Sequence, residues 1–379
     1  MSLFFEDIIS RRDFLKKSAL VALGSVLLPK LVKFGRAQTI GLIKPQRALY
    51  FEKLAKKKIK CVLCPHRCIV SKGDRGFCRV RENRDGEYYT LVYSNPCAIH
   101  IDPIEKKPLF HFLPGTTALS IATAGCNFSC KNCQNWDISQ ARPDHTANYE
   151  LGPGQVVDLA IAYKAPTVAY TYTEPTVFFE YMLDTAKQAK EKGILNIYHS
   201  NGYINQAPLR ELAPYLDGAN IDLKAYSNEF YQDITRGTLS PVLETLKTLK
   251  QQGVWLEITN LVIPTKNDSD TMLRDLCTWI KQNLGNDTPI HFSRFYPQYK
   301  LQNIPPTPIE TLKKAAEIAR GTGLDYIYIG NVPGLKEENT YCPNCGKLII
   351  DRKGYNVTET NLTNGKCKFC KAKISGRWQ

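Results

Sequence analysis

Three cysteines, Cys126, Cys130 and Cys133, stand in the stretch TAGCNFSCKNCQNW, residues 123–136, with the spacing C-x3-C-x2-C. A closed thiolate site uses four ligands, whereas three thiolates on a four-iron cluster leave one iron free to bind a small molecule. The spacing therefore predicts a [4Fe-4S] cluster. The alternatives are zinc, with His145 as the nearest further ligand, and a disulfide, which would leave one cysteine unpaired.

A second set of cysteines lies near the C-terminus, in two C-x2-C pairs separated by 21 residues. Its members are Cys342, Cys345, Cys367 and Cys370. This spacing is typical of a zinc ribbon, in which each pair turns two sulfurs toward one ion. We predict structural zinc, with two disulfides or a redox-active pair as alternatives.

A third set places four cysteines within 18 residues, in CVLCPHRCIVSKGDRGFC. Its members are Cys61, Cys64, Cys68 and Cys78, and His66 is a spare ligand. The spacing predicts a metal site but does not choose between zinc and a second iron–sulfur cluster. Of the two remaining cysteines, Cys277 lies in a helical pattern and is expected in the core, and Cys97 receives no assignment.

Apolar runs alternate with helical patterns from about residue 118 onward. The runs rich in β-branched and aromatic residues are 118–124, 167–173, 194–200, 218–224, 255–263, 289–296 and 324–330. Strand–helix units in series predict an α/β fold with a parallel sheet, and this number of units favours a partial or complete (β/α) barrel. No glycine-rich dinucleotide motif follows the first run, where the cysteines stand instead.

Helix boundaries between these runs are marked by proline, glycine and capping residues. Pro175 and Pro241 each begin a helical pattern, and Gly193 and Gly253 end them. The sequence TPIE, residues 307–310, predicts a capping box with proline at the first helical position.

Polar residues gather where the predicted strands end. They are Glu174, Asn201, Asp222, Lys224, Asn260, His291, Arg294 and Asn331. In barrel enzymes the carboxyl ends of the strands carry the active site, so their joint placement predicts one. Each residue alone has a structural alternative: His291 could be a hydrogen-bonded core histidine, and Asp222 and Lys224 a structural pair.

The formal charge of +14 is concentrated near the N-terminus. Residues 1–60 carry 14 basic and 4 acidic residues, a net of +10, which leaves +4 for the rest of the chain. A nearly balanced body argues against a nucleic-acid groove. The lysine-rich stretch 53–61 is expected to be the solvated face of a helix.

The N-terminal segment has the pattern of an export signal. Arg11 and Arg12 are followed by Phe-Leu-Lys, by an apolar run at 18–29 and by the small residues Gly35 and Ala37. The run is too short for a comfortable membrane span, and the order resembles a twin-arginine signal. We therefore expect extracytoplasmic export, with an uncleaved anchor or a cytoplasmic protein as alternatives, and a membrane association only through this segment.

The cysteine motif after the first strand resembles the radical S-adenosylmethionine (SAM) superfamily. Within it, the chain resembles the radical enzymes of the AmmeMemoRadiSam system, which are related to pyruvate formate-lyase activating enzymes. The stretches that carry the resemblance are CVLCPHRC (61–68), DPIEKKPLFHFLPG (102–115), YTYTEPT (170–176), NIDLKAY (220–226), HFSRFYP (291–297), YIYIGNVPG (326–334) and TYCPNCG (340–346).

The resemblance implies SAM as a second cofactor and a reduced flavodoxin- or ferredoxin-like electron donor. It implies that Glu174 lies at the methionine end of SAM and that Asn201 and Asp222 line the cofactor pocket. Lys224 and His291, in the same pocket, are the catalytic candidates. TYTEP replaces the glycine-rich form common in the superfamily, and the export signal is a second departure.

The sequence thus predicts a radical SAM enzyme that splits SAM to a 5′-deoxyadenosyl radical and removes hydrogen from an unknown substrate, which could be a protein. The alternatives are an activase that installs a glycyl radical on a partner protein, an exported iron–sulfur or metal-binding protein without radical chemistry and, more remotely, a nucleic-acid-modifying enzyme. The predicted parts are a signal (1–37), a Cys-rich region (38–117), the barrel (118–335) and a zinc-ribbon-like module (336–379).

Overall fold

The computed structural model describes residues 38–379, which belong to one compact unit. The predicted signal, residues 1–37, lies outside the described residues, so export and membrane anchoring remain predictions from the sequence. Within residues 38–379, none of the helices has the length and apolar character needed to cross a bilayer.

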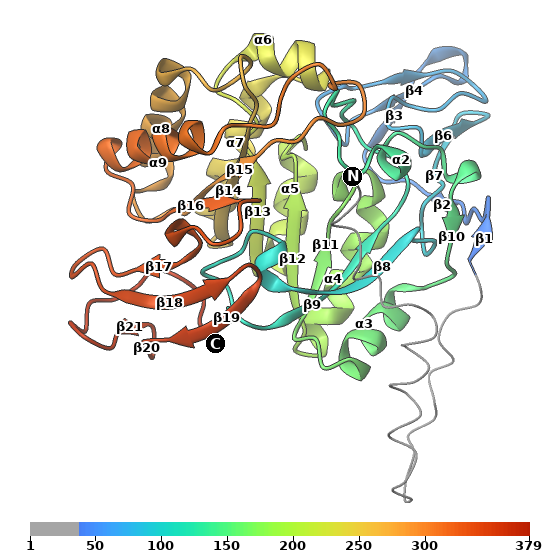
Figure 1. Ribbon diagram of the computed structural model, residues 1–379. Coiled ribbons are helices and arrows are strands. Elements are labelled where there is room, and N and C mark those ends of the chain that lie inside the picture. The colour runs from blue at the N-terminus through green and yellow to red at the C-terminus, as the bar shows by residue number, and fades with distance from the viewer. Residues whose placement is uncertain (1–37) are drawn as a thin grey trace, which may run out of the picture. The chain divides into compact units, whose positions relative to one another are not determined.

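An eight-stranded sheet forms the centre of the fold (Figure 1). Its strands follow one another in space in their chain order. They are β8 (Ala98–Pro103), β9 (Thr117–Ala122), β11 (Thr167–Tyr170), β12 (Leu195–Ser200), β13 (Gly218–Asp222), β14 (Trp255–Val262), β15 (Ile290–Arg294) and β16 (Ile327–Gly330).

The seven strands from β9 to β16 are parallel, and each coincides with one of the predicted apolar runs. The parallel α/β prediction is therefore confirmed. Among the described strands, β16 and β8 are the two ends of the sheet and do not pair, so the sheet is open and corresponds to a partial barrel. β8 pairs antiparallel with β9 and was not predicted.

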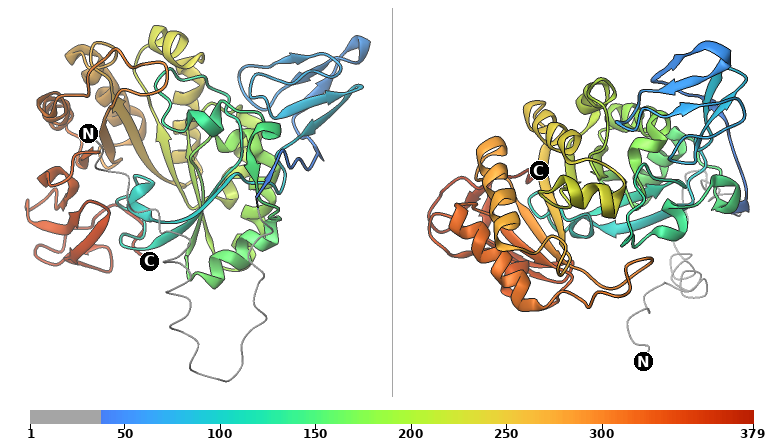
Figure 2. Two further views of the ribbon diagram at one scale, coloured as in Figure 1. Left: turned by 45° about the vertical axis from the view of Figure 1, so that its right-hand side comes forward. Right: turned by 90° about the horizontal axis from the view of Figure 1, so that it is seen from above.

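Helices cover the outer face of this sheet (Figure 2). The longer ones are α3 (Pro153–Ala162), α4 (Phe179–Glu191), α5 (Gln206–Leu212), α7 (Leu239–Gln251), α8 (Asp270–Leu284) and α9 (Ile309–Thr322). Strand β11 is buried on both faces, since all four of its residues are buried, and it therefore reads as a continuous run instead of an alternating pattern. Cys277 is fully buried in α8, which confirms its predicted place in the core.

The predicted capping box before α9 is wrong. Pro308 occupies the N-cap position, and no side chain caps this helix. The Thr307 hydroxyl instead donates to the Val262 carbonyl at 2.6 Å and accepts from the Phe295 amide at 2.9 Å. A tertiary contact to the strand ends has therefore replaced the local one.

The N-terminal region forms two small antiparallel sheets (blue in Figure 1). One contains β2 (Gln46–Arg47), β6 (Arg81–Arg84) and β7 (Glu87–Thr90), and the other β3 (Phe51–Lys53), β4 (Ile59–Cys61) and β5 (Ile69–Val70). The lysine-rich stretch 53–61 is therefore not helical. It is a hairpin around the short 3-10 helix η1 (Ala55–Lys57), since Ile59 and Cys61 alternate into the core while Lys56–Lys58 stay in solvent.

The C-terminal region (red in Figure 1) forms strands that lie beyond β16. They are β17 (Thr340–Tyr341), β18 (Leu348–Lys353), β19 (Asn356–Thr360), β20 (Leu362–Thr363) and β21 (Lys366–Cys367). The remaining short elements are β1 (Thr39–Ile40), β10 (Ala147–Asn148), α2 (Trp136–Ser139), α6 (Asn228–Phe230), η2 (Ile104–Lys106), η3 (Pro143–His145), η4 (Pro175–Phe178), η5 (Ala213–Tyr215), η6 (Tyr231–Thr235) and η7 (Lys336–Glu338).

Candidate functional site

A cavity of about 470 Å³ opens at the carboxyl ends of the parallel strands. The structure brings the three spaced cysteines and six of the eight polar residues predicted at the strand ends together around it, whereas Asn260 and Arg294 do not line it. The lining residues are Cys126, Cys130, Cys133, Glu174, Asn201, Asp222, Lys224, His291 and Asn331. A cavity of this volume is large enough to hold a small-molecule ligand beside the sulfurs that line it.

The loop that carries the cysteines runs from β9 to α2 and is held by its backbone. The amides of Ser129 and Lys131 donate to carbonyls of η6, Thr235 and Ile234, both at 2.9 Å. The side chain of Gln140 donates to the Phe128 carbonyl at 3.2 Å. These contacts tie the loop to η6 and to Gln140.

The three sulfurs are free thiols that face the cavity. Cys126 Sγ accepts hydrogen bonds from the Phe128 amide at 3.3 Å and from Asn201 Nδ2 at 3.8 Å. Such donors stabilise a thiolate that is bound to metal. His145, the proposed ligand in the zinc alternative, is exposed on η3 and does not line the cavity, so this donor set suits a cluster held by three thiolates.

Glu174 organises the turns that follow β11 and β12. Its carboxylate accepts from the Thr176 amide at 3.0 Å, the Ser200 hydroxyl at 2.7 Å and the Asn201 amide at 2.9 Å. Burial raises the pKa of Glu174, and these donors oppose that effect. Gly202, with φ of 71°, completes the turn, where an added Cβ would lie 2.9 Å from Ile221. Glu174 therefore positions Asn201 beside Cys126.

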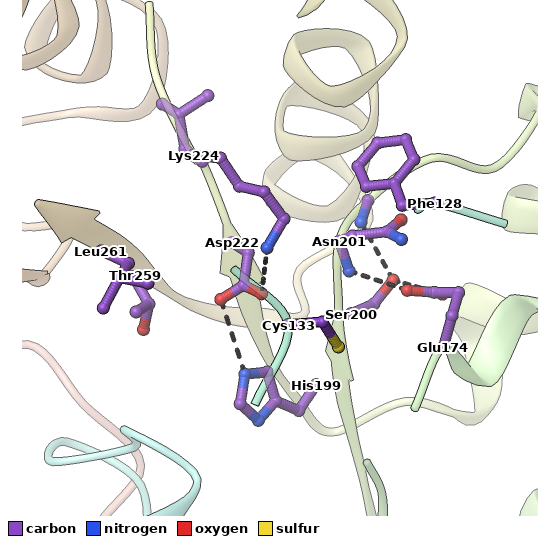
Figure 3. A network of polar contacts seen from close by, with 12 residues as sticks. Phe128, Cys133, Glu174, His199, Ser200, Asn201, Asp222, Lys224, Thr259 and Leu261 are labelled. Carbon is purple, nitrogen blue, oxygen red and sulfur yellow. Dashed lines mark hydrogen bonds and ion pairs between the residues drawn. The ribbon is translucent and has the colours of Figure 1, made fainter. Parts of the chain in front are cut away.

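Asp222 lies between a lysine and a histidine at the end of β13 (Figure 3). Its carboxylate is 2.9 Å from Lys224 Nζ and 3.7 Å from His199 Nε2. Asn260 donates to the carbonyls of Leu223 and Lys224, at 2.8 and 3.2 Å, and so holds this segment in place. His199 also lines the cavity; it was missed because it stands two residues before Asn201, inside the predicted strand.

Asp222 and Lys224 keep their charges although both side chains are partly buried. Burial would raise the pKa of Asp222, but Lys224 and His199 lower it below its usual range. Burial would lower the pKa of Lys224, but Asp222 and Cys130 raise it. Burial also raises the pKa of Cys130 to about 12, and the Lys224 ammonium opposes that rise. Lys224 thus favours the ionised form of a cysteine that would bind metal.

His291 is held by a carboxylate below the cavity. Its Nε2 lies 2.7 Å from Glu257 Oε2, and its ring stacks on Tyr328 at 4.9 Å between centroids. Glu257 also accepts from the amides of Phe110 and His111, at 3.0 and 2.8 Å. His291 therefore lines the cavity as a fixed side chain with one ring nitrogen engaged, and its catalytic role stays a prediction.

A cationic residue that received no role from the sequence also lines the cavity. Lys107 Nζ lies 2.5 Å from Asp102 Oδ2 and 4.3 Å from the centre of the Tyr172 ring, and Tyr172 also bonds to Asp102. Burial lowers the pKa of Lys107 to about 8, against the pull of Asp102. The stretch 102–115 was noted only as a match to a family, because a lysine before a proline has no recognisable local pattern.

The C-terminal cysteines converge on one point. The four sulfurs lie within 4.8 Å of one another, with Cys342 and Cys370 at 3.5 Å and Cys345 and Cys367 at 3.8 Å. All are free, so the structure contains neither of the two disulfides considered as alternatives. Sulfurs bound tetrahedrally to zinc at about 2.3 Å stand about 3.8 Å apart. This set therefore has the geometry of a metal site.

The matches to known proteins include the three-cysteine loop and, for one relative, most of the chain. The profile of the radical SAM superfamily matches residues 120–277, which include the three cysteines and the residues from Glu174 to Lys224. An uncharacterized protein of Methanocaldococcus jannaschii, MJ0808, is 49% identical over 331 residues, 87% of this chain and 98% of the relative.

Two more distant similarities cover shorter parts of the chain. The pyruvate formate-lyase-activating enzyme of Clostridium pasteurianum is 25% identical over 171 residues, 43% of this chain and 68% of the relative. A solved radical SAM methyltransferase from Sphaerobacter thermophilus has a TM-score of 0.46 and 15% identity over 62% of this chain and 71% of that chain. Residues 120–277, which carry the cysteine loop, thus form a region that matches the radical SAM superfamily.

Proposed function

We propose that the protein is a radical SAM enzyme that reductively cleaves SAM and removes a hydrogen atom from a substrate. The observation that carries this proposal is the cavity at the strand ends, where three free cysteines and no fourth cysteine of the described chain meet polar groups of both signs. The vacant fourth position is what a cluster needs in order to bind a small molecule directly.

The cofactors supply the chemistry, and the chain holds them. When bound, a [4Fe-4S] cluster delivers the electron that splits SAM into methionine and a 5′-deoxyadenosyl radical. Cys126, Cys130 and Cys133 would bind the cluster, and Lys224 keeps a positive charge beside Cys130. Since the cavity walls are made by buried strand ends, the same residues would exclude water from the reaction.

SAM carries a carboxylate, an ammonium group and a sulfonium, so its pocket must offer charges of both signs. The cavity offers acceptors at Glu174 and Asp222 and ammonium groups at Lys224 and Lys107. We assign Asn201 and Glu174 to the methionine end, since Glu174 places Asn201 within 3.8 Å of Cys126 Sγ. Asp222 lies on the other side of the cysteine loop and is assigned to the remaining part of SAM.

The same proposal extends to the subfamily and the partner proteins. We place the chain with the radical enzymes of the AmmeMemoRadiSam system and expect a flavodoxin- or ferredoxin-like electron donor. A glycyl-radical activase is the second candidate, favoured by the similarity to the activating enzyme of Clostridium pasteurianum. An activase would need a protein substrate for turnover, and a small-molecule enzyme would not.

The first test measures product formation by the wild-type chain. The protein is purified anaerobically, reconstituted with iron and sulfide, and incubated with SAM and dithionite. We expect 5′-deoxyadenosine and methionine in equal amounts, and no product without dithionite. A protein that binds SAM in calorimetry but forms no 5′-deoxyadenosine would contradict cleavage. Neither binding nor product would instead favour an exported iron–sulfur protein without radical chemistry.

We also propose that Cys342, Cys345, Cys367 and Cys370 bind structural zinc. A hydrogen bond from Asn344 is the main cause that lowers the pKa of Cys370 to about 6, which favours the thiolate that zinc requires. The bound ion would link the short strands of this region, which otherwise pack only around a small core that includes Ile349 and Ile374.

Replacing Cys342 by alanine is expected to remove this zinc and to lower stability, because a small zinc module has little other core. We expect about one zinc fewer per chain and a melting temperature lower by several degrees. The exposed Lys368→Ala is the control in the same loop and should change neither value. An unchanged zinc content in the Cys342 variant would refute the assignment.

A further inference from the structure

The four N-terminal cysteines surround a cavity of their own. Cys61, Cys64, Cys68 and Cys78 all line it, at the junction between the N-terminal sheets and the loop of the proposed active site. Its volume is about 20 Å³, which exceeds the about 10–15 Å³ that one water molecule needs. The sulfurs therefore enclose a space instead of closing on a single point.

The separation of these sulfurs differs from that of the C-terminal set. Within residues 38–379, only the C-terminal cysteines have sulfurs that all lie within 4.8 Å of one another. Neither the three-cysteine loop nor the N-terminal set forms such a compact group. In a [4Fe-4S] cluster each thiolate binds a different iron, so the sulfurs stand farther apart than those on one zinc ion. By this criterion the N-terminal set resembles the radical SAM motif.

Two buried hydrogen-bond donors in the cavity wall have no acceptor. Arg81 is 1% exposed and Tyr88 is 0% exposed, and both line the cavity. Arg81 Nε and the Tyr88 hydroxyl have no hydrogen-bond partner in the structure. Buried donors without acceptors are unfavourable, so a ligand with additional acceptors fits the site. The inorganic sulfides of a cluster are such acceptors, and a zinc ion brings none.

The backbone around Cys68 is shaped for a ligand as well. The Phe77 amide donates to Cys68 Sγ at 3.5 Å. A Cβ at Gly76 would lie 3.1 Å from the Tyr88 hydroxyl and 3.8 Å from Cys68 Sγ, so glycine leaves this hydroxyl and this sulfur open to the same space. Both small sheets contribute to the wall of this cavity, with Cys61 from β4 in one sheet and Tyr88 from β7 in the other.

His66, the spare ligand in the sequence, is already engaged. Its Nε2 lies 2.7 Å from the Asn127 carbonyl, and its ring packs against Phe77 at 4.4 Å between centroids. The ligand set is therefore four cysteines. Asn127 lines this cavity and accepts from Asn201 at 2.8 Å, while an added Cβ at Gly125 would lie 2.7 Å from the Cys78 carbonyl. The four-cysteine cavity thus packs directly against the Cys126 loop.

We infer that Cys61, Cys64, Cys68 and Cys78 bind a second iron–sulfur cluster, with Arg81 and Tyr88 donating to its sulfides. This site goes beyond the proposed SAM cleavage, which needs only the cluster of the three-cysteine loop. Four thiolates would complete the coordination of the second cluster, so it would offer no open iron to a substrate.

The metal content of the wild-type chain tests this inference without any variant. Anaerobically reconstituted and desalted protein is analysed for iron, acid-labile sulfide and zinc. We expect about eight irons and about one zinc per chain if both clusters have four irons. Any iron content clearly above four with one zinc supports the inference. About four irons with about two zinc ions would overturn it.

A variant that lacks the first cluster isolates the second site. In Cys126→Ala/Cys130→Ala/Cys133→Ala, we expect iron, sulfide and visible charge-transfer absorption to remain at about half the wild-type level. Adding Cys64→Ser and Cys68→Ser should remove them, whereas adding Cys277→Ala, in the core of α8, should not. Zinc or no metal in the triple variant, with a wild-type circular dichroism spectrum, would contradict a second cluster.

These outcomes are independent of the test of function. If the triple variant holds iron but the wild-type protein forms no 5′-deoxyadenosine, the proposed function fails and the second cluster stands. If the wild-type protein forms 5′-deoxyadenosine but contains two zinc ions and four irons, the function stands and this inference fails.

Discussion

Replacing Cys126 by alanine is expected to abolish 5′-deoxyadenosine formation and to remove about four irons per chain. The loop offers three sulfurs to the cavity, and none of the other described cysteines lines it. Two thiolates cannot hold the cluster, so the effect is a complete loss instead of a partial one. Iron analysis together with chromatographic detection of 5′-deoxyadenosine measures both effects on one sample.

The matched control is Cys277→Ala, the same substitution at a cysteine that only packs in the core. Removing one buried sulfur there should cost about 1 kcal/mol of stability and leave iron and product formation intact. A Cys126 variant that retains its full iron and forms 5′-deoxyadenosine would refute the role of this loop. An equal loss in the Cys277 variant would show that the assay reports folding alone.

Replacing Asp222 by asparagine is expected to have the largest effect among the polar residues of the cavity. Lys224 would keep its charge but lose its carboxylate, in a pair whose side chains are only 28% and 21% exposed. Removing one member of a buried pair costs about 3–5 kcal/mol, and the partial exposure here places the expected loss near about 3 kcal/mol. Urea denaturation of the metal-free protein measures this loss, and calorimetry should show about tenfold weaker SAM binding.

The control for this prediction is Asp233→Asn. Asp233 also pairs with a lysine, Lys131, at 2.5 Å, but the two side chains are 59% and 36% exposed. Solvent screening at the surface reduces the expected change in stability to about 0.5 kcal/mol or less. Similar losses in both variants would contradict a special role for the Asp222 pair.

The effect of Asp222 also depends on pH. Because Lys224 and His199 lower the pKa of Asp222 in the folded state, its stabilising contribution is present above the unfolded pKa of about 3.9. That contribution is lost as the pH falls further, toward the folded pKa. The difference in unfolding free energy between the wild-type protein and Asp222→Asn should therefore be constant near neutral pH and shrink below about pH 4.

The parallel strands and the cysteine loop were predictable because both are encoded in short stretches of chain. Residues 167–170, for example, are buried on both faces of the sheet and therefore show no alternating pattern. The spacing of Cys126, Cys130 and Cys133 is likewise local, and the polar residues at the strand ends follow once the strands are placed.

The partners of these residues depended on contacts between distant parts of the chain. Glu257 binds His291 from a neighbouring strand, and Lys107 reaches the cavity from the segment that follows β8. Thr307 does not cap α9, because its hydroxyl instead bonds to the Val262 carbonyl and the Phe295 amide at the ends of two strands. Hydrogen-bond partners of this kind are chosen by packing, which local sequence patterns do not record.

The N-terminal and C-terminal sets of four cysteines show most clearly which features the sequence determined and which the tertiary structure determined. The sequence alone established that each contains four cysteines within reach of one another, and for the N-terminal set it left zinc and a cluster open. Only the tertiary structure distinguished sulfurs that converge within 4.8 Å from sulfurs that surround a cavity with Arg81 and Tyr88 in its wall. The physical reason is that metal nuclearity depends on sulfur separation and on the surrounding donors, which the packing of the sheets decides.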